Sequence, residues 1–384
     1  MIGVIADDLT GAAEIGAVGL RHGLHAEIIR SGEPNGHTDI VCFDTDSRSC
    51  SPNDAAKRVA TAAQILRAAG AQWIYKKVDS VLRGHVTIEI EAAMQQLKLD
   101  RSLLLPANPS LGRTIRDGHY FIHGKLIHKT EFGRDPEYPR RTSQVLRLLK
   151  VPEKFSICIG NGDRRLLDQT IVIGEAGTSK DVVEWAGTIS GPETLPAGGS
   201  EFFSALLDRE KPAASNGANQ VPPSAPVREL FVCGTSTDSS RKFVTTARKR
   251  KQPVMTLPAE LVWGAELSPT ARASITRRAV EAFDTHSRVI LAVGLPLVQD
   301  AGIARRLSQN IVQIAEGIIN EVPLTHVFAE GGATASELVR RMRWPRLTVE
   351  RELAPGVATL SVGSNQSTLF TIKPGTYTWP AQWT

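Results

Sequence analysis

The sequence has few cysteines, and their spacing excludes the kinds of site that depend on them. Only four occur among 384 residues. None forms a C-x-x-C pair, and the spacing matches neither a zinc site nor a disulfide framework. We therefore expect free, buried thiols in a reducing compartment. The sequence does not identify which residues, if any, bind a metal ion. The four residues are Cys42, Cys50, Cys158 and Cys233.

Long hydrophobic runs are also absent. The longest mostly apolar run, residues 289–298, is interrupted by Gly294 and Pro296. A helix that crosses a bilayer needs about 20 apolar residues, so no membrane span is predicted. Asp7, Asp8 and Glu14 fall where a signal peptide would be uninterrupted and apolar. We expect a soluble, cytoplasmic protein.

The charge balance does not indicate nucleic-acid binding. Lys and Arg number 45 against 40 Asp and Glu, which gives a net charge of +5. The densest basic cluster, residues 248–251, is short and has no interleaved aromatic side chain. Nucleic-acid binding needs a basic domain with a recognisable motif, and none is found. We interpret the cluster as a solvated helix end, and a small anionic substrate fits the mild positive bias.

Two familiar phosphate-handling motifs are missing. Residues 118–125 resemble a P-loop, but five residues separate Gly118 from Gly124, and Leu126 follows the lysine. The Walker A pattern requires four residues there and Ser or Thr after the lysine. In the D-x-D-x-T pattern of aspartyl-phosphate enzymes, the nucleophile's position is held by Ala6. That substitution argues against a phosphatase.

The length and one proline-rich stretch predict two domains. A chain of 384 residues exceeds what one hydrophobic core usually serves. Residues 208–228 contain four prolines, many small polar residues and no apolar periodicity, which is typical of a linker. We predict an N-terminal domain over 1–210, a linker over 211–228 and a C-terminal domain over 229–384.

Both halves alternate short β-rich runs with helical patterns, and polar or Gly/Pro residues follow each run. This order predicts two α/β domains with largely parallel sheets. We expect Thr10 to cap a helix that extends towards His22. The expected strands are 2–6, 40–43, 73–78, 103–105, 230–233, 289–293, 326–329 and 370–372, and further expected helices are 53–69, 239–249, 269–283 and 304–320.

The strand ends of the first domain carry the strongest chemical signal. Asp8 follows the first predicted strand, Lys77 and Asp79 lie at the end of the third, and Arg83 and Arg113 follow in nearby loops. If these strands are neighbours, the three cations would face one anion, and Asp8 or Asp79 would bind hydroxyl groups. The alternative is that Asp8 only caps a helix and the Lys and Asp side chains form surface pairs.

In the second domain, two glycine-containing turns follow strands and precede helices. They are Gly234-Thr235-Ser236-Thr237 and Gly331-Gly332-Ala333-Thr334. Exposed backbone N–H groups and hydroxyls at a helix N-terminus form an anion site suited to phosphate. The alternative is that both turns are ordinary structural joints.

Taken together, these segments resemble the four-carbon acid sugar kinase family. The resemblance covers nearly the whole chain, and its blocks follow the order found in that family. The blocks are IADDLTGA at 5–12, DTDSR at 44–48, KKVDSVLRG at 76–84, PANPSLGR at 106–113, GHYFIHGKLIHKTEFGRDP at 118–136, VCGTSTDSSR at 232–241, GGATA at 331–335, LAPGV at 353–357 and KPG at 373–375.

The resemblance implies an ATP- and Mg²⁺-dependent kinase acting on threonate, erythronate or 3-oxotetronate, with no Walker A loop. The N-terminal domain would bind the sugar acid and the C-terminal domain the nucleotide, so we expect the active site in the interdomain cleft. Asp8 and Asp79 are the catalytic candidates, and the sequence does not decide which of them is the general base. The implied substrate ligands are Ser47, Arg48, Lys77, Arg83 and Arg113, and the implied nucleotide ligands are Gly234, Thr235, Thr237, Gly331, Gly332, Ala333, Thr334 and Gly375.

Some positions depart from the family pattern. Ala333 stands where the family usually has an acidic residue, and Val81 replaces a threonine of the D-S-T-L-R-G block. The final block continues as Thr376-Tyr377-Thr378 instead of G-F-G. Ala333 and the altered final block motivate the alternative hypothesis of a non-catalytic, sugar-acid-sensing relative, while Val81 is expected to shift the choice of substrate. No nucleic-acid or membrane partner is expected, and a homodimer is left open.

Overall fold

The computed structural model describes most of the chain, which forms two compact units, Met1–Asn216 and Gly217–Thr384. The described residues are 1–135, 138–150, 157–160, 170–191, 193–210, 227–296, 300–363, 368–375, 377–380 and 383. Most of the predicted linker, residues 211–226, lies outside them. Both units alternate strands and helices, as predicted, and the two-domain α/β architecture is confirmed.

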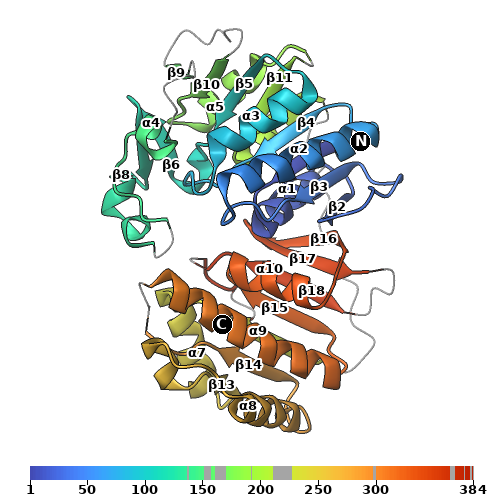
Figure 1. Cartoon of the computed structure of the whole chain (residues 1–384), viewed down its shortest axis with the longest axis vertical. Helices are drawn as coiled ribbons and strands as arrows, with labels where there is room; N and C mark the ends of the chain where they lie inside the picture. Colours follow the sequence, from blue (N-terminus) through green and yellow to red (C-terminus); the bar gives the residue numbers. More distant parts are fainter. Residues whose placement is uncertain are drawn as a thin grey trace. The chain divides into compact units, whose positions relative to one another are not determined.

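The first unit is built on a parallel sheet with the order β2-β3-β1-β4-β11-β5-β10-β9 (Figure 1). Every pairing between these neighbours is parallel. Its central strands are almost entirely buried, as expected for a sheet covered on both faces. The strands are β1 Ile2–Ala6, β2 Ala26–Ile29, β3 Ile40–Asp44, β4 Ile74–Lys77, β5 Arg101–Leu105, β9 Ile157–Gly160, β10 Thr170–Gly174 and β11 Thr194–Gly198.

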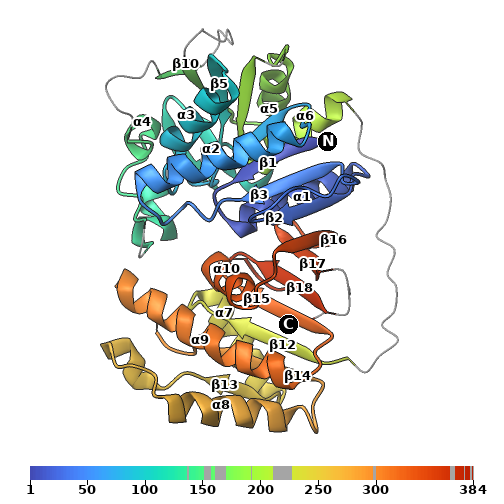
Figure 2. The same ribbon diagram turned by 45° about the vertical axis from the view of Figure 1, so that its right-hand side comes forward.

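Helices cover both faces of this sheet. α2 Pro52–Ala68 and α3 Val86–Leu97 pack together on one face, while α1 Leu9–Arg21, α5 Ser179–Gly187 and α6 Ser200–Glu210 cover the other (Figure 2). A small antiparallel sheet stands beside them, made of β6 Arg113–Arg116, β7 His119–Ile122 and β8 Lys125–Leu126. The short elements are α4 Val145–Leu148 and the 3₁₀ turns η1 Pro109–Leu111, η2 Ile127–Lys129 and η3 Glu131–Arg134.

The cap of α1 differs from the sequence prediction. Asp8, and not Thr10, is the N-cap, because its Oδ1 accepts a hydrogen bond of 2.8 Å from the backbone N–H of Gly11. Asp8 has extended backbone angles, whereas Thr10 already lies inside the helix. The helix therefore begins directly at the strand end, and the Asp8 carboxyl stays at its N-terminus. Aspartate is among the preferred N-cap residues.

The chain order of the strands explains where the site forms. From β1 the chain first builds β2 and β3 on one side, and then crosses to place β4 on the other side of β1. Ligands of open α/β sheets bind beyond the carboxyl ends of the strands at such a reversal. The segments that follow β3, β1 and β4 carry three of the sequence blocks described above, and the fold brings them together at one edge.

The second unit has a mixed sheet with the order β13-β14-β12-β15-β18-β17-β16. Its first five strands are parallel, as predicted, but β16, β17 and β18 pair in an antiparallel manner. The strands are β12 Glu229–Cys233, β13 Val254–Thr256, β14 Arg288–Ala292, β15 His326–Glu330, β16 Arg346–Ala354, β17 Val357–Val362 and β18 Leu369–Lys373. The helices are α7 Asp238–Lys249, α8 Pro269–Ala282, α9 Ala301–Glu321, α10 Gly332–Arg341 and the 3₁₀ turn η4 Ala259–Trp263.

The cysteines agree in part with the expectation of free, buried thiols. Cys42, Cys50 and Cys233 are free thiols, and Cys42 and Cys233 are buried, but Cys50 is only half-buried. The basic run at 248–251 is exposed at the end of α7, as predicted. Within the described part of the chain, no helix has the length and apolar character needed to span a membrane.

An aromatic cluster forms much of the core of the second unit. Phe231 stacks on Phe328 with ring centroids 4.1 Å apart, and Trp379 packs edge-on against both. The indole N–H of Trp379 donates a hydrogen bond of 3.0 Å to Glu330 Oε2. The tail of the chain is thus part of the core of this unit.

We expect Trp379→Ala to destabilise this unit strongly. Trp379 is 4% exposed, and removing a buried tryptophan typically costs about 3–5 kcal/mol. Trp263 is the matched control because it is 87% exposed, so Trp263→Ala should leave stability nearly unchanged. Thermal or denaturant unfolding of both variants checks the expectation. Equal effects of the two substitutions would contradict the role of the tail.

Candidate active site

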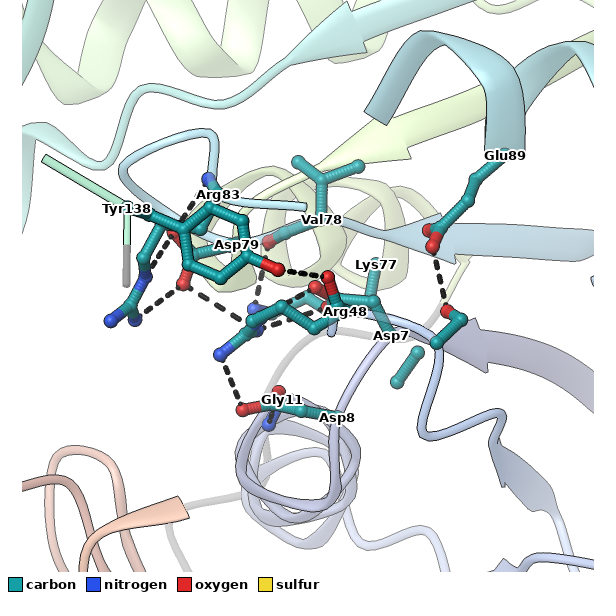
Figure 3. Close-up of polar contacts among 12 residues, drawn as sticks. Asp7, Asp8, Gly11, Arg48, Lys77, Val78, Asp79, Arg83, Glu89 and Tyr138 are labelled. Atoms are coloured by element: carbon teal, nitrogen blue, oxygen red, sulfur yellow. Dashed lines mark hydrogen bonds and ion pairs between the residues drawn. The ribbon is translucent and has the colours of Figure 1, made fainter. Parts of the chain in front are cut away.

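A guanidinium group surrounded by carboxylates lies at the carboxyl ends of β3, β1 and β4 (Figure 3). Arg48 contacts Asp7 through two nitrogens, Nε at 2.7 Å and Nη2 at 3.1 Å. Its Nη1 donates to Asp8 Oδ2 at 2.7 Å, and its Nη2 lies 3.4 Å from Asp79 Oδ1. One cation therefore links acidic residues from two strand ends.

Asp79 organises the loop that follows β4. Its Oδ2 accepts hydrogen bonds from the backbone N–H groups of Val81, at 3.1 Å, and Arg83, at 3.0 Å. The side chain of Arg83 adds two more, from Nε to Oδ2 at 3.0 Å and from Nη2 to Oδ1 at 2.8 Å. With Arg48 also close, both oxygens of Asp79 are engaged. Asp79 therefore holds two arginines in place.

The same loop has a conformation that ordinary residues avoid. Leu82 has a φ of 63°, in the left-handed region that disfavours branched side chains. Arg140 donates from Nη1 to the Leu82 carbonyl at 3.0 Å, and Leu82 is 1% exposed. Backbone strain of this kind persists where the surroundings impose it and is frequent at functional sites.

Two further predicted cations lie in the same unit. Lys77 Nζ pairs with Glu14 Oε2 at 3.1 Å, and Glu14 Oε1 accepts a hydrogen bond of 2.7 Å from Ser200. Arg113, on β6, donates from Nη1 to the hydroxyl of Ser80 at 2.7 Å, which connects it to the loop after β4. Of the predicted substrate ligands, Arg48, Lys77, Arg83 and Arg113 thus all contact segments around the strand ends.

Ser47 is placed differently from its neighbours in the sequence. It is fully buried, and its hydroxyl donates a hydrogen bond of 2.6 Å to Glu89 on α3. A second contact of 2.8 Å joins it to the hydroxyl of Thr45. The side chain of Ser47 therefore turns away from the carboxylates around Arg48.

The electrostatics separate the two catalytic candidates. Burial raises the pKa of the Asp8 carboxyl, and the nearby charge of Asp7 adds to the rise, so that the attraction of Arg48 only partly offsets it. Burial also acts on Asp79, but Arg83 and Arg48 outweigh it and hold that pKa well below the ordinary value. Asp8 is also the more accessible, with a side chain 15% exposed against 5% for Asp79.

Sequence reasoning misses several residues of this region. It singles out Asp8 and not the preceding Asp7, and it assigns no site role to Glu14, Lys76 or Glu89. One available signal is the alternation of side chains along a strand, which sends Lys76 and Lys77 to opposite faces of the sheet. Lys77 meets Glu14 on α1, and Lys76 meets Glu89 on α3, which covers the other face.

In the second unit, the predicted nucleotide residues gather at the ends of β12, β15 and β18, which are neighbours in the sheet. Gly234 packs so closely on Thr334 that a Cβ at Gly234 would lie 1.8 Å from the Thr334 hydroxyl. Thr237 is the N-cap of α7 and donates a hydrogen bond of 2.8 Å to the carbonyl of Gly375. Gly331 precedes α10 with a φ of 97°, a conformation that favours glycine.

The remaining nucleotide candidates complete this group. Thr235 lies against Gly375, with its side chain 3.4 Å from where a Cβ of Gly375 would stand. Gly332 and Ala333 form the first turn of α10, and Ala333 is exposed there. Two helix N-termini and three loops thus form one small surface, which fits phosphate because helix N-termini present free N–H groups.

A buried ion pair lies at the root of these loops. Lys373 Nζ is 3.5 Å from Glu330 Oε2, and both side chains are fully buried at adjacent strand ends. Burial raises the pKa of Glu330 and lowers that of Lys373, although each charge partly counters the shift of the other. Lys373 also donates to the carbonyl of Pro374 at 3.0 Å, so this lysine anchors the Lys373-Pro374-Gly375 loop.

The comparison with known protein families finds one match in each half of the chain. Residues 2–159 match the sugar-binding N-terminal domain, and residues 230–377 match the nucleotide-binding C-terminal domain. The chain belongs to the four-carbon acid sugar kinase family. Among the described residues of this kinase, no group of three His, Cys, Asp or Glu side chains could hold a metal ion.

Relatives of the kinase extend over nearly its whole length. A D-threonate kinase of Salmonella typhimurium is 24% identical and covers 92% of this chain and 89% of its own. A 3-oxo-tetronate kinase of Pseudomonas savastanoi pv. phaseolicola is also 24% identical, and the match covers 98% of this chain and 94% of the relative. The solved structure of a Salmonella typhimurium protein described as a tRNA synthase has a TM-score of 0.78 at 19% identity, covering 98% and 96%, which shows a shared fold.

Proposed function

We propose that this kinase transfers the γ-phosphate of ATP to a hydroxyl group of threonate, erythronate or 3-oxotetronate. The observation that carries the proposal is the cluster of Arg48, Asp8, Asp79 and Arg83 at the reversal of strand order in the sugar-binding domain. Relatives that span both domains are named D-threonate kinase and 3-oxo-tetronate kinase. Phosphoryl transfer depends mainly on positioning and charge neutralisation, which such a cluster provides.

The sugar acid's carboxylate would bind to the cations of this cluster. Arg83 is the strongest candidate, because Asp79 holds one edge of its guanidinium through Nε and Nη2 and its side chain is still 29% exposed. A planar guanidinium binds a carboxylate through two parallel hydrogen bonds. Arg113 and Lys77 would contribute further positive charge around the substrate.

We propose Asp8 as the general base. A base must be accessible and must have a pKa nearer to the working pH than that of a free carboxyl. Asp8 meets both conditions, because its pKa is raised and its side chain is the more exposed of the two candidates. Asp79 meets neither, so its proposed role is to position Arg83 and Arg48.

ATP would bind to the nucleotide-binding domain at the turns after β12, β15 and β18. Gly234 packs closely on Thr334, and the positive φ of Gly331 leads the chain into α10, whose first backbone N–H groups would bind phosphate. Ala333, exposed in the first turn, leaves this helix N-terminus without a competing negative charge. Mg²⁺ would arrive on the phosphates, since this ion is typically bound by few carboxylates together with substrate oxygens and water.

The two reactants would bind to different domains, so phosphoryl transfer requires the bound sugar acid and the bound ATP to come together. Reacting atoms must approach to about 3–3.5 Å before in-line transfer. We propose that this happens in a cleft between the domains and that closure excludes the water that would otherwise hydrolyse ATP. A homodimer stays a prediction.

A coupled ADP-release assay with each four-carbon sugar acid in turn tests the proposed function. We expect Mg²⁺-dependent turnover with at least one of them and a phosphorylated product by mass spectrometry. Binding of a sugar acid without turnover, at any Mg²⁺ concentration, would instead support a non-catalytic sensor. If no sugar acid binds and none is turned over, the proposal is refuted.

A further inference from the structure

A buried ion pair lies beside the sugar-acid site without touching the carboxylates around Arg48. Lys76 Nζ is 2.8 Å from Glu89 Oε2, and their side chains are 0% and 2% exposed. Lys76 also donates to the backbone carbonyl of Lys77 at 2.8 Å. Taking two charges out of water is costly, and such pairs are often no more stabilising than apolar side chains. This pair therefore invites an explanation other than stability.

The second oxygen of Glu89 provides that explanation. Glu89 Oε1 accepts a hydrogen bond of 2.6 Å from Ser47, the residue directly before Arg48. Ser47 also contacts the Thr45 hydroxyl, which donates a hydrogen bond of 2.8 Å to the carbonyl of Ala6 at the end of β1. Glu89 thus connects α3 and β4 with the loop that carries Arg48.

This loop has a backbone that needs external support. Asp46 has a φ of 48°, a left-handed conformation for a residue other than glycine. Beyond it, the backbone N–H groups of Ser47 and Arg48 both donate to the carbonyl of Asp7, at 3.0 Å and 3.3 Å. Those bonds fix the loop against β1, while the side chain of Ser47 fixes it from the other face. The backbone that carries Arg48 is therefore held both by β1 and by the side chain of Ser47.

We propose that Glu89 is a positioning residue for the sugar-acid site, which orients Arg48 through Ser47, and that Lys76 balances the charge of Glu89 in its buried position. The inference rests on the proposed role of Arg48 in the sugar-acid site. It also reassigns Ser47, which the family resemblance implied as a substrate ligand, to holding the loop. Glu89 and Lys76 contact neither reactant in this account.

The test is steady-state kinetics of Glu89→Gln with both substrates varied. Glutamine has the same shape, but it cannot offer a charged oxygen to Ser47 and also balance Lys76. We expect the KM for the sugar acid to rise about tenfold or more, because the lost bond is charge-assisted. The KM for ATP should stay within twofold of wild type. Partial unfolding would not raise one KM alone, because it lowers the fraction of active enzyme and leaves both KM values unchanged.

Two further variants keep the test decisive. Glu91→Gln, on the same helix, is the matched control and should leave both KM values unchanged, because Glu91 bonds only to Gln95 in the described part of the chain. Ser47→Ala should raise the sugar-acid KM in the same direction as Glu89→Gln. The double variant should be no worse than the more affected single variant, because both substitutions break one link.

The outcomes separate this inference from the proposed function. If folded Glu89→Gln keeps a sugar-acid KM within twofold of wild type, the inference is wrong while the kinase proposal stands. If Glu89→Gln does not fold, Ser47→Ala decides by the same criterion. If the wild-type protein phosphorylates no four-carbon sugar acid, the proposed function fails, and the inference that rests on it fails too.

Discussion

Asp8→Asn should lower kcat by about 10²- to 10⁴-fold, the usual contribution of a general base. The substitution preserves the local structure, because asparagine caps helices as well as aspartate does and can still accept the bond from Gly11. Because burial raises the pKa of Asp8, the folded protein gains no stability from the charge of this carboxylate, and its loss should not lower stability. Stopped or continuous ADP-release kinetics measure the effect.

The pH profile offers an independent check on the same residue. A base works only when ionised, so activity should fall as the pH drops through the pKa of Asp8. Since burial raises that pKa, the acid limb should lie above the ordinary range of a carboxyl group. Asp79, whose pKa is held well below that range, would place the limb lower. A limb at ordinary or lower pH, or a kcat for Asp8→Asn near wild type, would rule out Asp8.

Arg83→Ala and Gly331→Val should impair different substrates. Loss of the Arg83 guanidinium removes charge-assisted hydrogen bonds, each worth about 1.5–3 kcal/mol, so sugar-acid binding should weaken about 10- to 150-fold. Valine at position 331, where φ is 97°, adds strain of about 1–3 kcal/mol at the start of α10 and should weaken ATP binding tenfold or more. Calorimetric titration of each variant with each ligand measures both effects.

Matched controls isolate these effects from general destabilisation. Gly363→Val imposes a similar backbone strain in the same unit, because Gly363 has a φ of 66° and a Cβ there would meet no atom within 4 Å, yet ATP affinity should be unchanged. Arg147→Ala removes an exposed arginine of α4 and should leave sugar-acid binding unchanged. Loss of ATP binding in both Arg83→Ala and Gly331→Val would contradict the division of labour between the domains.

Local patterns predicted only part of the elements, because strands such as β2 Ala26–Ile29 and helices such as α3 Val86–Leu97 were not among the expected ranges. The apolar runs at 2–6 and 40–43 became β1 and β3, and the helical pattern at 53–69 became α2 Pro52–Ala68. Such patterns work because the burial of each element depends on its own periodicity. The prediction did not include β16 Arg346–Ala354 and β17 Val357–Val362, and no local signal shows that these two strands pair in an antiparallel manner.

The sequence by itself determined that this protein has two α/β domains, with acidic and basic residues at strand ends in the first and glycine-containing turns before helices in the second. Only the tertiary structure decided which of these side chains meet. Arg48 contacts Asp7 because β1 and β3 are neighbours, and Ser47 faces Glu89 because α3 covers the opposite face from α1. The same packing separates the pKa values of Asp8 and Asp79, because burial and nearby charge, and not residue type, set the protonation of a carboxyl group.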